Sequence, residues 1–273
     1  PVLLEQIEAA WTGSQTNDTA MTAWWDGRAA SFAENSRQLP RRENSLTVRL
    51  LEDAGMIKPG GTALDVGCGA GRYSFLLADR GMKVHGTDIS PEMIRYARQR
   101  AEEEGSTVTF SADNWRQVEL VQRGWERAFD LVLANTTPAI CSVETFRKLS
   151  RASRNWCLLT KPTRRTNSVL DPLRQLIGVD TDLARPDEEL AYGFSLLWLE
   201  GYCPRLDYEV QHWNHVLPLE EAISFYTRRM ATFGQLDGEK ERQIAGYLGS
   251  IARDGMVEEE TDTTITALYW QVK

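Results

Sequence analysis

Long apolar runs are missing from this sequence: no stretch of about 18 apolar residues occurs in its 273 residues, so no transmembrane helix is predicted. The N-terminus also lacks the basic-then-apolar layout of a secretory signal peptide. Its four cysteines show no C-x-x-C spacing, and there are only three histidines, which argues against a disulfide framework and a metal site. These absences predict a soluble cytoplasmic protein with no metal and no membrane partner.

Basic residues are fewer than acidic ones, so the formal net charge is −8. Such a chain repels a polyanion as a whole, so nucleic acid is not an expected partner. One segment differs: from Thr145 to Leu170 there are seven basic residues and no acid. We interpret its first four cations as a solvated helix face and keep a basic groove for RNA as the alternative.

What the sequence does contain is the stretch T-A-L-D-V-G-C-G-A-G-R-Y-S from Thr62 to Ser74. It predicts a buried strand that stops at Asp65 and a helix that begins at Arg72. Three alternate glycines lie between them, at Gly67, Gly69 and Gly71. Because glycine has no Cβ, we expect the loop to turn tightly and to admit a ligand at all three positions.

An acid, Asp88, ends the next apolar run, V-H-G-T-D, about 20 residues after the first glycines. In doubly wound sheets an acid at this place accepts both ribose hydroxyls of a nucleotide. Dinucleotide-binding loops favour G-x-G-x-x-G, whereas the spacing here is G-x-G-x-G with Asp65 before it. A carboxylate repels a pyrophosphate and attracts a cation. The pattern therefore favours a cationic cofactor that carries adenosine.

At this point the chain resembles the class I S-adenosylmethionine-dependent methyltransferases. The resemblance is carried by four motifs in order: L-D-V-G-C-G-A-G-R at Leu64–Arg72, V-H-G-T-D-I-S at Val84–Ser90, S-A-D-N-W at Ser111–Trp115 and F-D-L-V-L-A-N at Phe129–Asn135. It implies an α/β fold: a doubly wound, mostly parallel seven-stranded sheet with helices on both faces and an antiparallel last strand. Helical segments near the N-terminus and in the C-terminal half would form a cap.

The resemblance also assigns cofactor contacts. Gly67, Cys68 and Gly69 would line the methionine half of S-adenosylmethionine, and Asp88 would bind its ribose. Asp65 and Gly71 are further predicted cofactor-binding residues. Ile89, Asp113, Asn114 and Trp115 would surround the adenine, and Asn135 would present its carbonyl to the methionine ammonium. A plain turn or helix cap is the alternative for Asp113 and Asn114.

Two groups are candidates for binding the acceptor. Trp25, Arg28 and Phe32 lie in a segment that looks like the leading helix folded over the cofactor, with core packing as the alternative. Lys161, Arg164 and Arg165 follow the fifth predicted strand, where they could clamp an anionic acceptor or form a solvated loop. The sequence identifies no catalytic base.

We expect a single domain with insertions. Residues 1–55 would form a helical lid, with helices at Leu3–Trp11, Met21–Ser36 and Leu46–Ala54, and residues 56–162 the cofactor-binding core. The fifth strand is predicted at Trp156–Thr160. Residues 163–205 and 218–258 would be helical insertions for the acceptor pocket, and residues 206–217 and 259–273 closing strands.

The predicted function is methyl transfer from S-adenosylmethionine, with S-adenosylhomocysteine as product, to a small acceptor at O, N or S, with anionic acceptors among the candidates. Asn135 is followed by threonines instead of the prolines and aromatic of base-flipping enzymes, so a base-flipping enzyme is not expected. Three alternatives stay open: an RNA or protein methyltransferase, a noncatalytic cofactor-binding protein, and a nicotinamide oxidoreductase.

Overall fold

A computed structural model describes residues 2–13, 17–38, 45–178 and 186–272. Within these ranges one seven-stranded sheet forms from β1 (Thr62–Val66), β2 (Lys83–Asp88), β3 (Thr109–Ala112), β4 (Phe129–Asn135), β5 (Ser153–Asn167), β6 (Arg205–Pro218) and β7 (Met256–Gln271). Their order is β3-β2-β1-β4-β5-β7-β6. Neighbours are parallel from β3 to β5, and β7 is antiparallel to both β5 and β6. The predicted doubly wound, mostly parallel fold is confirmed.

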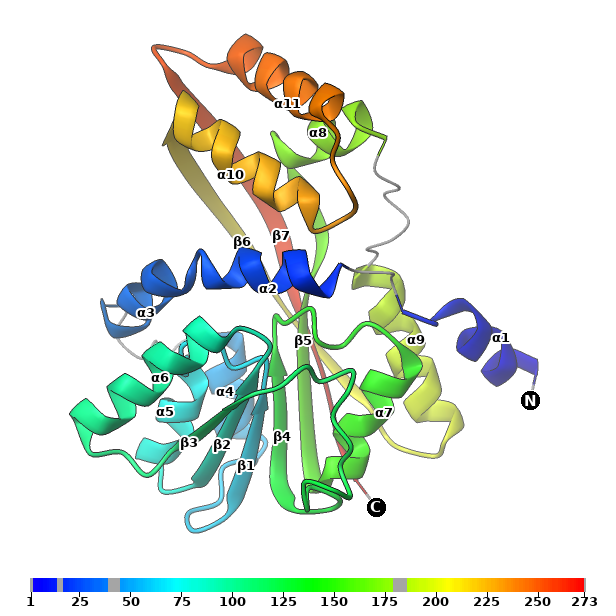
Figure 1. Cartoon of the computed structure of the whole chain (residues 1–273). Coiled ribbons are helices and arrows are strands. Elements are labelled where there is room, and N and C mark those ends of the chain that lie inside the picture. The colour runs from blue at the N-terminus through cyan, green and yellow to red at the C-terminus, as the bar shows by residue number, and fades with distance from the viewer. Residues whose placement is uncertain (1, 14–16, 39–44, 179–185, 273) are drawn as a thin grey trace.

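Helices cover both faces of this sheet (Figure 1). They are α1 (Val2–Ala10), α2 (Asp18–Asp26), α3 (Ala29–Gln38), α4 (Leu46–Asp53), α5 (Arg72–Asp79), α6 (Pro91–Glu104), α7 (Val143–Ala152), α8 (Leu170–Leu176), α9 (Pro186–Leu199), α10 (Leu219–Ala231) and α11 (Gly238–Ile251). One apolar core joins α4, α5 and α6 to one face, and a second joins α1, α7 and α9 to the other.

Helix α6 shows how the sequence sets these boundaries. The Ser90 hydroxyl accepts from the backbone N–H of Met93, and Pro91 occupies the first turn, where its missing N–H costs nothing. At the other end Gly105 takes left-handed backbone angles and closes the helix. Serine, proline and glycine at these places in the sequence therefore mark both ends of the helix.

The last three strands are longer than the parallel ones and continue past the core into an upper lobe, where α8, α10 and α11 pack around them (Figure 1). A separate apolar core fills this lobe. Its fully buried members are Leu173, Ala222, Met230, Ile244 and Leu248. The lobe therefore has its own hydrophobic interior but shares β5, β6 and β7 with the main sheet.

The length of strand β5 differs from the prediction. The strand predicted at Trp156–Thr160 is too short, because pairing with β7 carries it on to Asn167. The residues from Lys161 to Arg165, expected in a loop, are consequently part of an antiparallel strand. The sequence pattern of this segment did not indicate the longer strand, because its pairing partner, β7, lies about 100 residues further along the chain.

The N-terminal helices differ from a second prediction. The single helix expected over Met21–Ser36 is two, α2 and α3, which are separated at Gly27 and Arg28. Asn17 caps α2, so that helix also begins earlier than predicted. Helix α2 lies between the sheet and the upper lobe (Figure 1), and it touches both α6 and α10. No helix within the described ranges is both long enough and apolar enough to cross a membrane.

Candidate active site

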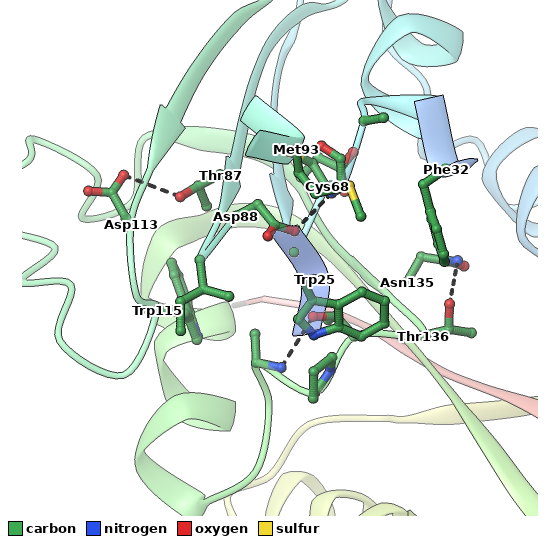
Figure 2. Close-up of a pocket in the computed structure, with 18 of the residues that line it drawn as sticks. Trp25, Phe32, Cys68, Thr87, Asp88, Met93, Asp113, Trp115, Asn135 and Thr136 are labelled. Atoms are coloured by element: carbon green, nitrogen blue, oxygen red, sulfur yellow. Dashed lines mark hydrogen bonds between the residues drawn. The ribbon is translucent and has the colours of Figure 1, made fainter. Parts of the chain in front are cut away.

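A cavity of about 360 Å³ lies at the carboxyl ends of the parallel strands, beneath α2 and α3 (Figure 2). The residues that line it come from four strand ends and from the N-terminal segment. Those predicted as cofactor or acceptor contacts are Trp25, Phe32, Asp65, Gly67, Cys68, Gly69, Asp88, Ile89, Asp113, Asn114, Trp115 and Asn135. The structure thus brings twelve separately predicted residues into one site.

The loop between β1 and α5 turns at its three glycines. What an added Cβ would contact differs from one glycine to the next. All three have positive φ, at 69°, 54° and 85° for Gly67, Gly69 and Gly71. A Cβ on Gly67 would lie 2.0 Å from Oγ1 of Thr137, and one on Gly71 would meet the Phe75 and Phe110 rings. A Cβ on Gly69 would find nothing nearer than 3.9 Å. Only Gly69 thus has open space where a Cβ would be, while protein side chains fill that space at Gly67 and Gly71; the expected ligand contacts of the three glycines remain predictions.

Asp88 holds this loop in place. Its Oδ2 accepts from the backbone N–H of Gly69 at 2.9 Å, and its Oδ1 accepts from the N–H of Ser90 at 2.9 Å. Burial raises the pKa of Asp88, although these hydrogen bonds oppose the rise. Figure 2 shows the carboxylate at the centre of the cavity. It is placed to accept from hydroxyl groups of a ligand lying over Gly69.

Asp65 lies deeper, at the end of β1, and is 2% exposed. The Ser74 hydroxyl donates to its Oδ2 at 2.7 Å. Burial raises its pKa to about 7; the Ser74 hydrogen bond lowers it and the nearby Asp88 raises it further. A cation bound in the cavity would favour the ionised form of this carboxyl group.

The third strand end supplies Asp113, Asn114 and Trp115. The carboxylate of Asp113 is already engaged, since it accepts from the Thr87 hydroxyl and forms an ion pair with Arg123. The Asn114 amide donates to Asp18 at 2.9 Å. The Trp115 indole is buried and donates to a backbone carbonyl of α7. All three line the cavity, and their proposed contacts with an adenine remain predictions.

Asn135 ends β4 at the other side of the cavity. Its side-chain oxygen accepts from the hydroxyls of Thr47 at 2.7 Å and Thr160 at 2.9 Å. Its amide donates to the Thr136 hydroxyl (Figure 2). The side-chain oxygen therefore has two donors already, which leaves the backbone carbonyl as the group that could face an ammonium.

The aromatic residues of the lid meet over this cavity. The rings of Trp25 and Phe32 stand edge to face with centroids 5.7 Å apart, and both line the cavity (Figure 2). Asp26 anchors the segment, because its carboxylate accepts from the Ser90 hydroxyl and from the N–H of Glu92 at the start of α6. Sequence reasoning missed Asp26, which lies 64 residues from Ser90 and carries no local signal.

The predicted cationic clamp is not assembled here. Lys161 is buried, and its ammonium donates to Glu189 at 2.7 Å and to the backbone carbonyl of Ile140. Arg164 and Arg165 are exposed and, like Arg28, do not line the cavity. The joint clamp by Lys161, Arg164 and Arg165 is thus not supported by their positions.

The histidines supply no base to the cavity. Both ring nitrogens of His85 are hydrogen-bonded, to Thr109 and Ser111, as expected for a packed residue. His212 is exposed and pairs with Asp262, and the ring of His215 packs on Phe225. His212 and His215 lie on opposite faces of β6, because they are an odd number of residues apart on a strand.

Comparison with known proteins begins with a family model. A model described as a methyltransferase domain matches residues 57–171, which contain the glycine loop, Asp88 and the third and fourth strand ends. Residues 57–171 of this chain therefore match a methyltransferase domain. This match agrees with the methyl transfer predicted from the motifs.

Relatives share this methyltransferase domain over part of their length. A putative methyltransferase, YqeM, of Bacillus subtilis is 25% identical over 48% of this chain and 52% of its own length. A ubiquinone biosynthesis O-methyltransferase of Methylobacterium is 36% identical over 38% of each chain. A magnesium-protoporphyrin O-methyltransferase of Synechocystis is 36% identical over 37% of this chain and 47% of its own length. The matches therefore span about half or less of these relatives.

Solved structures match over more of the methyltransferase fold. A putative methyltransferase of Bacillus halodurans superposes with a TM-score of 0.52 at 17% identity, covering 82% of this chain and 97% of that one. A protein that converts a disulfide bond into a thioacetal group during echinomycin biosynthesis superposes with a TM-score of 0.51 at 21% identity, covering 93% and 92%. These likenesses concern the fold alone.

Proposed function

We propose that this chain is an enzyme that transfers a methyl group from S-adenosylmethionine to a small, anionic acceptor at O, N or S. The observation that carries the proposal is the open space over Gly69 with the Asp88 carboxylate beside it. Backbone atoms there can approach a nucleoside closely, and the carboxylate can accept from two sugar hydroxyls. The residues present therefore fit the cofactor.

When bound, S-adenosylmethionine supplies an activated methyl group that passes to a lone pair of the acceptor, while the carbon–sulfur bond breaks and S-adenosylhomocysteine is released. The task of this chain is to align the two reactants and to exclude water. Alignment alone can supply ~7 to 11 kcal/mol, so a site without a histidine base can still be catalytic. Trp25 and Phe32 cover the cavity and would exclude water from it.

Two observations support a small acceptor over RNA. The relatives in ubiquinone biosynthesis and on magnesium-protoporphyrin are named for small molecules. The basic stretch that could have formed an RNA groove is largely neutralised: Arg147 pairs with Glu8 and Glu200, Arg151 with Glu126, and Arg154 with Asp130. A cytoplasmic location remains a prediction.

The test begins with cofactor binding by calorimetry. We expect S-adenosylhomocysteine to bind and NAD to give no heat, because Asp65 would lie beside a dinucleotide's pyrophosphate. Incubation with methyl-labelled S-adenosylmethionine and a small-molecule cell extract should then yield a labelled product. Binding without any labelled product would favour the noncatalytic alternative, and label in RNA or protein would contradict the small acceptor.

The raised pKa of Asp65 predicts a pH dependence that separates the two cofactor forms. Only S-adenosylmethionine carries the sulfonium charge, so its binding should gain more than that of S-adenosylhomocysteine as Asp65 ionises near pH 7. We expect the ratio of the two dissociation constants to shift several-fold in favour of S-adenosylmethionine between about pH 6 and pH 8. Asp65→Asn should remove this shift.

The pH dependence of protein stability is an independent test of the raised pKa of Asp65. The pKa of Asp65 is about 7 in the folded protein and 3.8 for an ordinary aspartate carboxyl, so between these pH values the folded state holds one more proton than the unfolded state. Stability should consequently fall as pH rises through this window, and Asp65→Asn should not show that loss. An unchanged pH profile of unfolding in the variant would contradict the assignment.

A further inference from the structure

Four arginines gather between the lid and the upper lobe, outside the cofactor cavity. They are Arg28 after α2, Arg165 in β5, Arg174 in α8 and Arg229 in α10, and we call them the arginine cluster. Helix α2 crosses below α10 at this level (Figure 1). Residues from four separate elements therefore bring their charges to one place.

Aromatic rings link three of these guanidinium groups, and the fourth, of Arg165, lies 5.6 Å from the Trp213 ring. The Trp24 ring lies 5.1 Å from Arg28 and 5.4 Å from Arg229. The Phe233 ring lies 5.1 Å from Arg229 and 4.6 Å from Arg174. Stacking on rings fixes the planes of the guanidinium groups but leaves their N–H edges free to donate elsewhere.

The cluster carries more positive than negative charge. Among the described residues, Glu259 is the carboxylate that acts on Arg28 and Arg229, and Asp171 lies 3.7 Å from Arg174. Glu259 also accepts from the Tyr226 hydroxyl. Burial and the neighbouring Arg174, Arg165 and Arg28 lower the pKa of Arg229 to about 9. Arg228 also acts on Arg28, so five guanidinium groups face two carboxylates and positive charge is in excess.

One ring separates the cluster from the cofactor cavity. The Arg28 guanidinium lies 5.3 Å from the centre of the Phe32 ring, and Phe32 lines the cavity. Trp25, the neighbour of the clustered Trp24, lines it as well. A small molecule whose reactive end enters the cavity past Phe32 would thus extend its other end toward the arginines.

We propose that the arginine cluster binds a phosphate group of the methyl acceptor. This inference rests on the proposed function. A phosphate monoester carries a charge of about −1.5 to −2 at pH 7, which matches the excess in the cluster better than the single charge of a carboxylate does. Guanidinium groups also donate to phosphate oxygens in a paired geometry. Phosphate would therefore satisfy both the charge and the free N–H edges.

Inorganic phosphate is the probe, titrated by calorimetry into the protein saturated with S-adenosylhomocysteine. We expect saturable binding, weakened about tenfold or more by Arg229→Gln or Arg165→Gln, since each removes a charged hydrogen-bond donor. Arg242→Gln, an exposed arginine paired with Glu239 in α11, is the matched control and should bind like wild type. Arg165 is exposed, so its variant should fold even if that of Arg229 does not.

Three outcomes would overturn the proposal: no saturable phosphate binding to wild type, equal weakening by Arg242→Gln, or tighter binding of acetate, a monocarboxylate, than of phosphate. The affinity for S-adenosylhomocysteine is recorded for every variant and should not change. If wild type does not bind S-adenosylhomocysteine, the proposed function is contradicted and the phosphate proposal is not. In that case, titration of phosphate into the cofactor-free protein tests the arginine cluster.

Discussion

Replacing Asp88 with alanine should lower the affinity for S-adenosylhomocysteine by about 100-fold or more. The wild-type carboxylate holds the N–H groups of Gly69 and Ser90, each at 2.9 Å, and we propose that it also accepts from the cofactor's sugar hydroxyls. Each hydrogen bond to a charged group contributes roughly 1.5 to 3 kcal/mol, so the loss of two from the ligand alone corresponds to this change. Loosening of the glycine loop adds to it.

Calorimetry on wild type and Asp88→Ala measures this effect directly. Asp53→Ala is a suitable control, because Asp53 is an exposed carboxylate at the end of α4, away from the cavity. Circular dichroism should show that both variants remain folded. An affinity for Asp88→Ala within about threefold of wild type would remove the basis for the cofactor assignment.

Gly67→Ala should destabilise the fold by about 2 to 5 kcal/mol. Left-handed backbone angles cost a residue with a Cβ roughly 1 to 2 kcal/mol, and overpacking typically adds about 1 to 3 kcal/mol. Both apply here, because φ is +69° and the new Cβ would lie 2.0 Å from Oγ1 and 2.6 Å from Cβ of Thr137. Chemical denaturation measures the change in the free energy of unfolding.

Gly55→Ala separates the two contributions. Gly55 has a similar φ of +64°, but a Cβ there would meet nothing within 4 Å. The control should therefore lose only the backbone part, roughly 1 to 2 kcal/mol. Equal losses in the two variants would show that Thr137 yields easily and that the close packing at Gly67 is not needed for stability.

Local sequence was sufficient for the cofactor half of the molecule. Each parallel strand, its following turn and its helix lie within about 30 residues, and their apolar runs, caps and glycines act over that range. Asp65, Asp88, Asp113 and Asn135 could be placed at one edge of the sheet because the carboxyl ends of parallel strands meet there.

The sequence by itself determined where the chain turns after β1 and which acid ends β2, because both depend on residues adjacent along the chain. Only the tertiary structure decided that Lys161 is paired with Glu189 and that Arg28, Arg165, Arg174 and Arg229 converge. Those residues are brought together by the antiparallel pairing of β5 with β7 and by packing of α2 on α10. Long-range pairing of this kind depends on the whole core, and no local pattern records it.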